Sequence, residues 1–261
     1  MKICSIPLDI VYASPEYNLR IAREALDEVE TDTDLVVLPE LFTTAFVPDM
    51  PTVSTIAEGN NGPTMTAVRE WARTLGMAIA GSFLATDGEG HFYNRGFFAE
   101  PSGETVYYDK RHLFPLSTED KVYTAGREFP PLITYMGWRF RMVLCFDVRF
   151  PVWTRNRPEN MYDVLLVPAN WPHSRAGQFK ILLAARGVEN QIYVIAANRS
   201  GEDKYGVYEY TDSGMYDNLG TPVHETRGNG FHYALLDREA LMSGRKRFPA
   251  YVATDRWSIE L

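Results

Sequence analysis

Cys145 is the side chain best suited to act as a nucleophile. It lies in the segment Val143-Leu144-Cys145-Phe146-Asp147-Val148-Arg149-Phe150-Pro151, where an apolar run gives way to charged residues and a proline. A tight turn after a strand can expose a thiol and direct the next backbone N–H, here that of Phe146, at a bound oxyanion. The alternative is a buried core cysteine, the commonest state of a free thiol. Cys4, in an apolar segment near the start of the chain, keeps that second interpretation.

A thiol nucleophile needs a base to take its proton. None of the five histidines has a recognisable cysteine-protease context, and His112 is the best of them because it lies near Lys110. A buried carboxylate can do the same work. Glu40 is the candidate, since it follows the apolar run Leu35-Val36-Val37-Leu38 and precedes Leu41-Phe42. Taken alone, Glu40 could equally be a paired structural carboxylate.

Lys110 could assist both groups. It stands in the segment Tyr107-Tyr108-Asp109-Lys110-Arg111-His112-Leu113-Phe114. A lysine held beside a thiol favours the thiolate and stabilises an oxyanion. The alternative is a solvated basic cluster after an edge strand. Glu119 is weaker still by itself, because most glutamates in such a setting are surface loop residues.

The elements that must position these residues alternate between helix and strand. Helical spacing follows Ser14-Pro15-Glu16 and again Pro63, where a proline in the first turn favours a helix start. Short apolar runs and alternating patterns predict strands elsewhere. The expected strands are residues 35–38, 77–84, 92–100, 105–108, 139–145, 164–167 and 193–197, and a further helix is expected at 177–190.

Glu40, Lys110, Cys145 and Asn170 each follow the C-terminal end of a predicted strand. Open α/β sheets tend to place their sites at this edge. The alternation of strands and helices predicts an α/β layered sandwich. No linker or repeat divides the chain, so we expect one domain over residues 1–261.

Composition narrows the function classes. The formal net charge is −8, from 26 basic and 34 acidic residues, which argues against a nucleic-acid partner. Two cysteines in 261 residues fit a reducing compartment. The start of the chain does not resemble a signal peptide and no apolar run is long enough for a membrane span, so we expect a cytoplasmic protein without membrane association. The histidines and cysteines lack zinc spacing, and no glycine-rich phosphate loop is present, so no metal and no cofactor are expected.

Three segments taken together resemble a known signature. Leu38-Pro39-Glu40-Leu41-Phe42, the segment around Lys110 and the segment around Cys145 are similar, in that order, to the Glu-Lys-Cys motifs of the nitrilase superfamily, the carbon–nitrogen hydrolases. Pro168-Ala169-Asn170-Trp171-Pro172 and Ala185-Arg186-Gly187-Val188-Glu189-Asn190-Gln191 resemble two further family segments. The similarity extends over nearly the whole chain, and the omega-amidases look like the nearest subgroup.

The resemblance implies a four-layer α-β-β-α sandwich and a small-molecule amide substrate, such as the side-chain amide of 2-oxoglutaramate. It implies that Cys145 forms a thioester, Glu40 is the general base, and Lys110 with the N–H of Phe146 holds the oxyanion. Glu119 is implied as a second carboxylate that bonds Lys110 or orients substrate. A homodimer is expected on the same ground.

Several alternatives stay open at this stage. Another amidase, a nitrilase or a carbamoylase would use the same three residues. A catalytically silent binding or scaffolding protein is the alternative of another class. The residues considered for substrate binding are Arg111, His112, Arg149 and Trp171, with Arg175 a further possible cation.

Overall fold

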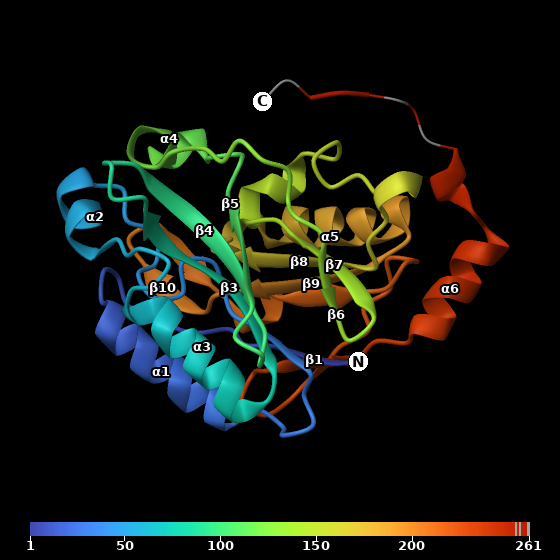
Figure 1. Ribbon diagram of the computed structural model, residues 1–261, viewed down its shortest axis with the longest axis horizontal. Coiled ribbons are helices and arrows are strands. Elements are labelled where there is room, and N and C mark those ends of the chain that lie inside the picture. Colours follow the sequence, from blue (N-terminus) through green and yellow to red (C-terminus); the bar gives the residue numbers. More distant parts are fainter. Residues whose placement is uncertain (254, 256, 260–261) are drawn as a thin grey trace.

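The computed structural model describes residues 1–253, 255 and 257–259. Its larger sheet has seven strands in the order β13-β14-β1-β2-β3-β4-β5 (Figure 1). The strands are β1 (Lys2–Ser5), β2 (Leu35–Val37), β3 (Ala78–Thr86), β4 (Phe92–Ala99), β5 (Thr105–Asp109), β13 (Glu225–Thr226) and β14 (His232–Leu235). Strands β1, β2 and β3 are parallel, whereas β4 and β5 continue antiparallel. Because two antiparallel pairings separate β3 from β5, β2 and β5 end at the same edge of the sheet.

The second sheet has five strands in the order β12-β9-β8-β7-β6. They are β6 (Ile133–Tyr135), β7 (Trp138–Met142), β8 (Val164–Ala169), β9 (Tyr193–Asn198) and β12 (Gly214–Tyr216). Strands β7, β8 and β9 are parallel. A separate hairpin is formed by β10 (Gly201–Asp203) and β11 (Gly206–Tyr208).

Helices cover the outer faces of both sheets. The α-helices of the described residues are α1 (Pro15–Asp27), α2 (Met50–Ile56), α3 (Pro63–Leu75), α4 (Glu119–Val122), α5 (Ala176–Asn190) and α6 (Arg238–Arg247), of which α1, α3 and α5 provide this cover. Helices α1 and α3 lie side by side against the larger sheet, and α5 packs on β9 and β12 of the smaller one (Figure 1). This arrangement confirms the expected α/β sandwich with its α-β-β-α layers.

The residues of β2 show why the two sheets and the helices stack in this way. Successive side chains of a strand point to opposite faces. Leu35 and Val37 therefore enter the core between the sheets, where they join residues of the second sheet, while Val36 packs in the core beneath α1 and α3. All three are fully buried, which explains the continuous apolar run in the sequence.

Most predicted elements are present with small shifts at their ends. The helix expected at 177–190 is α5, and the strand expected at 139–145 is β7, which ends at Met142 so that Cys145 starts a short 3-10 helix, η2 (Cys145–Arg149). Helix α1 begins at the predicted proline, but the Ser14 hydroxyl donates to the carbonyl of Tyr12 and does not cap the helix. No helix among the described residues has the length and apolar content that a membrane crossing requires.

Candidate active site

Four strand ends bring the predicted residues together. Glu40 and Lys110 follow β2 and β5 of the larger sheet, and Cys145 and Asn170 follow β7 and β8 of the smaller sheet. The sheets pack face to face, so these ends meet at one side of the sandwich. The sequence-based placement of all four residues at strand termini is therefore confirmed.

Lys110 lies between two carboxylates. Its Nζ is 2.8 Å from Oε1 of Glu40, and 2.9 and 3.1 Å from the two oxygens of Glu119. Lys110 and Glu40 are each 3% exposed and Glu119 is 2% exposed. Buried charges without partners are costly, so the three groups depend on one another for stability.

Glu40 is held by three further contacts. Asn94 Nδ2 donates to Glu40 Oε1 at 2.7 Å, and the backbone N–H of Asn170 donates to Oε2 at 2.9 Å. Asn170 Nδ2 also donates to the main-chain carbonyl of Glu40 at 2.9 Å. The carboxylate is thus fixed in position, with each oxygen accepting at least one hydrogen bond.

The backbone at Cys145 is strained. Its φ is 43°, in the left-handed region that a residue with a Cβ rarely adopts, and Leu41, directly after Glu40, has a φ of 49°. Such a conformation costs about 1–3 kcal/mol and persists only where the surroundings enforce it. Cys145 is 9% exposed. The N–H groups of Cys145 and Phe146 open η2, where a helix has no internal acceptors for them.

Asp147 enforces this turn. Its carboxylate is fully buried and accepts hydrogen bonds from the backbone N–H of Leu144 at 3.1 Å and of His112 at 2.9 Å. The hydroxyl of Tyr108 donates to it at 2.8 Å and accepts from Trp153 Nε1 at 2.8 Å. The segment that carries Lys110 and the turn that carries Cys145 are therefore tied to the same carboxylate.

The charges around Cys145 oppose one another. Burial raises the pKa of the Cys145 thiol well above its ordinary value, and the nearby Glu40 carboxylate raises it further, whereas Lys110 and the N–H of Asn170 lower it. Burial alone lowers the pKa of Lys110, but Glu119 and Glu40 raise it well above its ordinary range. Burial raises the pKa of Glu119, against the effect of Lys110. The resting site thus holds a neutral thiol beside a charged lysine.

Cys4 provides the contrast. It is fully buried in the core beneath α1 and α3. Burial raises its pKa to about 12. Lys2 and Glu30 also act on it, but both side chains are partly exposed, unlike the buried lysine–carboxylate cluster at Cys145. Its structural interpretation fits these surroundings.

The predicted substrate-binding residues differ in their surroundings. Arg111 donates to the carbonyl of Gly126 at 3.2 Å, and the ring of His112 bonds Asp147 at 2.8 Å and stacks on Phe150. Arg149 instead lies 4.9 Å from the ring centroid of Trp171 and donates to Gln178 of α5 at 2.6 Å. Arg111 and His112 are therefore engaged in the loop structure, and Arg149 has no acidic partner among the described residues.

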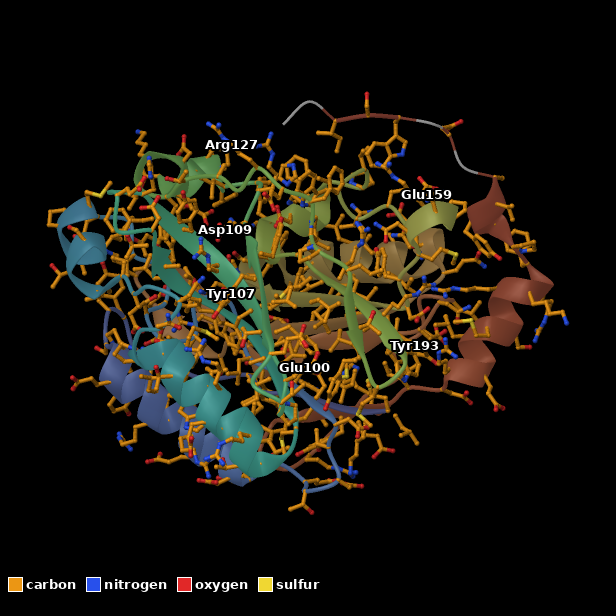
Figure 2. The ribbon with its side chains drawn as sticks, in the orientation of Figure 1. Glu100, Tyr107, Asp109, Arg127, Glu159 and Tyr193 are labelled. Atoms are coloured by element: carbon orange, nitrogen blue, oxygen red, sulfur yellow. The ribbon has the colours of Figure 1, made fainter. Side chains whose placement is uncertain are left out.

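Two other features lie outside this group of residues. A groove of about 660 Å³ borders β4 and β5, with Tyr107, Asp109 and Arg127 among its lining residues (Figure 2), and Arg95 pairs with Asp109 there. The groove does not include Glu40, Lys110 or Cys145.

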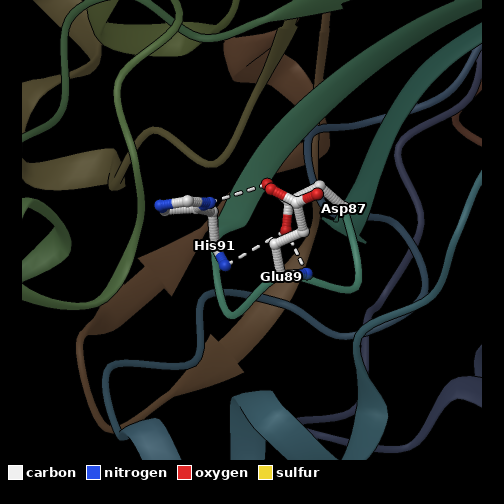
Figure 3. A group of neighbouring side chains, drawn as sticks. All are labelled: Asp87, Glu89 and His91. Atoms are coloured by element: carbon white, nitrogen blue, oxygen red, sulfur yellow. Dashed lines mark hydrogen bonds and ion pairs between the residues drawn. The ribbon is translucent and has the colours of Figure 1, made fainter.

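The turn between β3 and β4 gathers the exposed side chains of Asp87, Glu89 and His91 (Figure 3). Asp87 accepts from the backbone N–H groups of Glu89 at 2.8 Å and His91 at 3.2 Å, and bonds the His91 ring at 2.7 Å. These contacts explain the cluster as a tight turn.

Sequence reasoning missed Asn94. It lies inside β4 and is fully buried, and its amide reaches Glu40 across the sheet. The available signal was one uncharged polar residue on the same face as Phe92 in a strand that is otherwise rich in aromatic residues. A buried polar side chain requires a partner, but the sequence did not identify which one.

Together, the fold and the site define a class of hydrolase. A thiol at a strained turn, a fixed carboxylate and a buried lysine can form and cleave an acyl-enzyme without further groups. Residues 2–243 match the carbon-nitrogen hydrolase family. The chain therefore belongs to the carbon-nitrogen hydrolase family, whose members hydrolyse carbon–nitrogen bonds such as those of amides.

Individual relatives agree with this membership. The chain is 35% identical to omega-amidase YafV of Yersinia enterocolitica, over 98% of each protein. It is 30% identical to 2-oxoglutaramate amidase of Bacillus subtilis, over 77% of each. Among solved structures, a CN-hydrolase superfamily protein from Xanthomonas campestris with an arsenic adduct in its active site superposes with a TM-score of 0.91 at 35% identity, covering 100% of this chain and 99% of that one.

Proposed function

We propose that this enzyme is an omega-amidase that releases ammonia from the side-chain amide of 2-oxo acids such as 2-oxoglutaramate. The observation that carries the proposal is the buried Lys110, bonded to Glu40 and Glu119 and exerting its charge on the Cys145 thiol. The names of the Yersinia and Bacillus relatives support the choice of substrate.

In the proposed reaction, Cys145 Sγ attacks the amide carbon while Glu40 takes the thiol proton. Glu40 returns this proton to the amide nitrogen as the C–N bond breaks, so that ammonia leaves and a thioester remains on Cys145. Glu40 then takes a proton from water, whose oxygen attacks the thioester carbon. The S–C bond breaks, the proton passes to Sγ, and the acid is released.

Lys110 and the N–H of Phe146 are the proposed oxyanion donors. An oxyanion donor of this kind is typically worth about 3–4 kcal/mol of transition-state stabilisation. Lys110 is supported in this role because its ammonium remains charged between two carboxylates. Glu119 acts as a positioning residue, since it holds Lys110 and also accepts from the N–H of Phe114 at 2.6 Å.

The same proposal covers the wider context of the protein. We propose that residues 1–261 form one hydrolase domain, that the enzyme works in the cytoplasm, and that it forms a homodimer. Exposed Ile181 and Val188 on α5 support a surface for a second copy. Arg149 and Trp171 remain the substrate-binding candidates with suitable surroundings.

Steady-state ammonia release tests the substrate. We expect higher kcat/KM for 2-oxoglutaramate than for glutamine, simple aliphatic amides, nitriles or N-carbamoyl amino acids. Negligible turnover of 2-oxoglutaramate beside rapid turnover of one of the others would refute the omega-amidase assignment while leaving the hydrolase class intact.

Mass spectrometry tests the nucleophile. Brief exposure to substrate should add an acyl group to the wild-type protein, and the adduct should be absent in Cys145→Ala. Cys4→Ala is the matched control, because it removes the other thiol and should keep the adduct. A wild-type protein that neither forms the adduct nor reacts with iodoacetamide at Cys145 would favour a catalytically silent binding protein.

A further inference from the structure

Arg175 occupies a fixed position beside the site. It ends the 3-10 helix η4 (His173–Arg175), which follows Asn170 and Trp171. Its backbone N–H donates to the carbonyl of Pro172 at 2.9 Å, and its own carbonyl accepts from Trp171 Nε1 at 2.9 Å. The backbone that carries this side chain is therefore held by the same segment that holds Glu40.

The guanidinium of Arg175 reaches the loop that follows Lys110. Its central carbon lies 5.2 Å from the ring centroid of Phe114. The Phe114 ring lies 5.1 Å from that of Phe146, the residue next to Cys145, and the Phe114 N–H bonds Glu119. Two aromatic rings in edge-to-face contact thus connect the Arg175 guanidinium to the residue next to Cys145.

Among the described residues, Arg175 lacks the acidic partner that three buried arginines have, and in this it resembles the buried Arg141. Arg186, Arg199 and Arg245 each contact a carboxylate at 2.6–2.8 Å. Within the part of the chain that the structure describes, no carboxylate lies within ion-pair distance of Arg175, which is half-buried. Its planar donors are suited to bidentate binding of a carboxylate, and the Phe114 ring restricts their motion.

An anionic substrate needs such a cation. The protein carries a net charge of −8. Within the site, two carboxylates, Glu40 and Glu119, face one cation, Lys110, so the carboxylate of an anionic substrate would be repelled. Lys110 balances only one of these two carboxylate charges, so one negative charge in the site remains without a cation. A positive group placed apart from the reacting atoms would attract the remote end of the substrate without disturbing the chemistry.

We propose that Arg175 binds the carboxylate at the end of the substrate remote from the scissile amide, and that it thereby selects anionic ω-amides over neutral ones. The inference rests on the proposed omega-amidase function and assigns its charge selectivity to one residue. Arg149 differs from Arg175 because its guanidinium is anchored to Gln178 and stacked on Trp171.

The test compares two amides of equal chain length. Glutaramate ends in a carboxylate and valeramide ends in a methyl group, and 2-oxoglutaramate serves as the third substrate. In Arg175→Gln, the ratio of kcat/KM for glutaramate to that for valeramide should fall by roughly 10- to 100-fold, as expected for loss of a hydrogen bond to a charged group. The loss should appear mainly in KM, and 2-oxoglutaramate should follow glutaramate.

Two control variants separate recognition from general effects. Arg175→Lys keeps the positive charge but loses the planar, bidentate donors of the guanidinium. It should therefore recover part of the glutaramate-to-valeramide ratio of kcat/KM that Arg175→Gln loses. Arg127→Gln removes the same charge from an exposed arginine outside the site, so it should leave the ratio at its wild-type value. Circular dichroism and the melting temperature verify that each variant is folded.

The outcomes distinguish this inference from the proposed function. The inference about Arg175 fails if the wild-type enzyme hydrolyses 2-oxoglutaramate but Arg175→Gln lowers kcat/KM equally for glutaramate and valeramide. It fails likewise if the substitution lowers kcat/KM for neither amide, because Arg175 then does not bind the carboxylate. If the wild-type enzyme hydrolyses valeramide but neither anionic amide, the omega-amidase function itself is refuted.

Discussion

Lys110 Nζ lies 2.8 Å from Oε1 of Glu40, and both side chains are almost completely enclosed. This ion pair gives Glu40 two opposing effects on Cys145. Its negative charge raises the pKa of the thiol, yet its oxygen is the group best placed to accept the thiol proton. The two effects can be separated by experiment.

Glu40→Gln should therefore act in opposite directions on two reactions. Hydrolysis should fall by roughly 100-fold or more, because the amide cannot take the proton. Alkylation of Cys145 by iodoacetamide at about pH 8 should become faster, because the pKa of the thiol falls when the carboxylate charge is removed and Lys110 remains. Ammonia release and intact-mass labelling measure the two rates.

Glu16→Gln, on the exposed first turn of α1, is the matched control and should change neither rate. Near-wild-type hydrolysis in Glu40→Gln would transfer the base role to another group. His112 would be examined next, although its ring is already bonded to Asp147.

Lys110→Met should destabilise the fold as well as abolish activity. It leaves Glu40 and Glu119 buried without their cation, and breaking a buried pair in this way costs about 3–5 kcal/mol. Burial already raises the pKa of Glu119, and without the Lys110 charge it should rise further, so protonation favours the folded state. The loss of unfolding free energy relative to the wild type should be largest at neutral pH. It should shrink as the pH falls toward the pKa of a glutamate in the unfolded chain, about 4.3.

Urea unfolding at several pH values measures this deficit relative to the wild type. Lys121→Met, an exposed lysine nearby, should show no such pH-dependent deficit. If Lys110→Met loses the same stability at neutral and at acidic pH, Glu40 and Glu119 do not depend on Lys110 to remain charged in the folded protein.

The sequence predicted that Glu40, Lys110 and Cys145 lie together because each stands at the end of a predicted strand. Type and position alone left Glu40 and Cys145 open as structural residues, and the three segments together, with their resemblance to a known signature, favoured the catalytic interpretation. Asn94 was missed because it lies within β4, and its amide reaches Glu40 only because β3 pairs with both β2 and β4. Contacts between distant strands depend on register and twist, which local patterns do not encode.

Helices α2, α4 and α6 were also missed, for different reasons, and α4 has only four residues. Helix α6 buries Leu241 and Arg245, too few residues to give an apolar stripe. Helix α2 has seven residues, too short for periodicity to be visible. Capping signals were nevertheless present, because Asp49 and Asp237 accept hydrogen bonds from the first turns of α2 and α6.

Asp147→Asn should weaken both the fold and the reaction. An amide cannot accept from all of the Leu144, His112 and Tyr108 donors, so the loss of a charged acceptor should cost roughly 1.5–3 kcal/mol of stability. The turn at Cys145 should then relax from its positive φ, which moves Sγ and lowers kcat more than it raises KM. Denaturant unfolding and steady-state kinetics on one preparation measure both quantities.

Asp120→Asn, an exposed carboxylate on α4, is the control and should leave stability and kcat unchanged. If Asp147→Asn loses stability while kcat stays at the wild-type value, Asp147 supports the fold without positioning the nucleophile.

The paired rings of His224 and His232 should make stability depend on pH. Their centroids are 4.8 Å apart, and burial lowers the pKa of both rings below the ordinary value of 6.5. The unfolded chain therefore binds protons that the folded protein does not. Stability should fall as the pH drops below about 6.5 and should level off below the folded-state pKa values.

His232→Gln should flatten this dependence. The variant loses the ring contacts to Thr226 and to the Tyr210 carbonyl, so it should be less stable at pH 8 by roughly 1–2 kcal/mol. The further loss between about pH 7 and pH 5 should be smaller than in the wild type, because one proton-binding difference between the folded and unfolded states is gone. Exposed His91→Gln should retain the wild-type slope in this acidic range. An equal slope in His232→Gln and the wild type would assign the acid sensitivity to groups other than this buried ring.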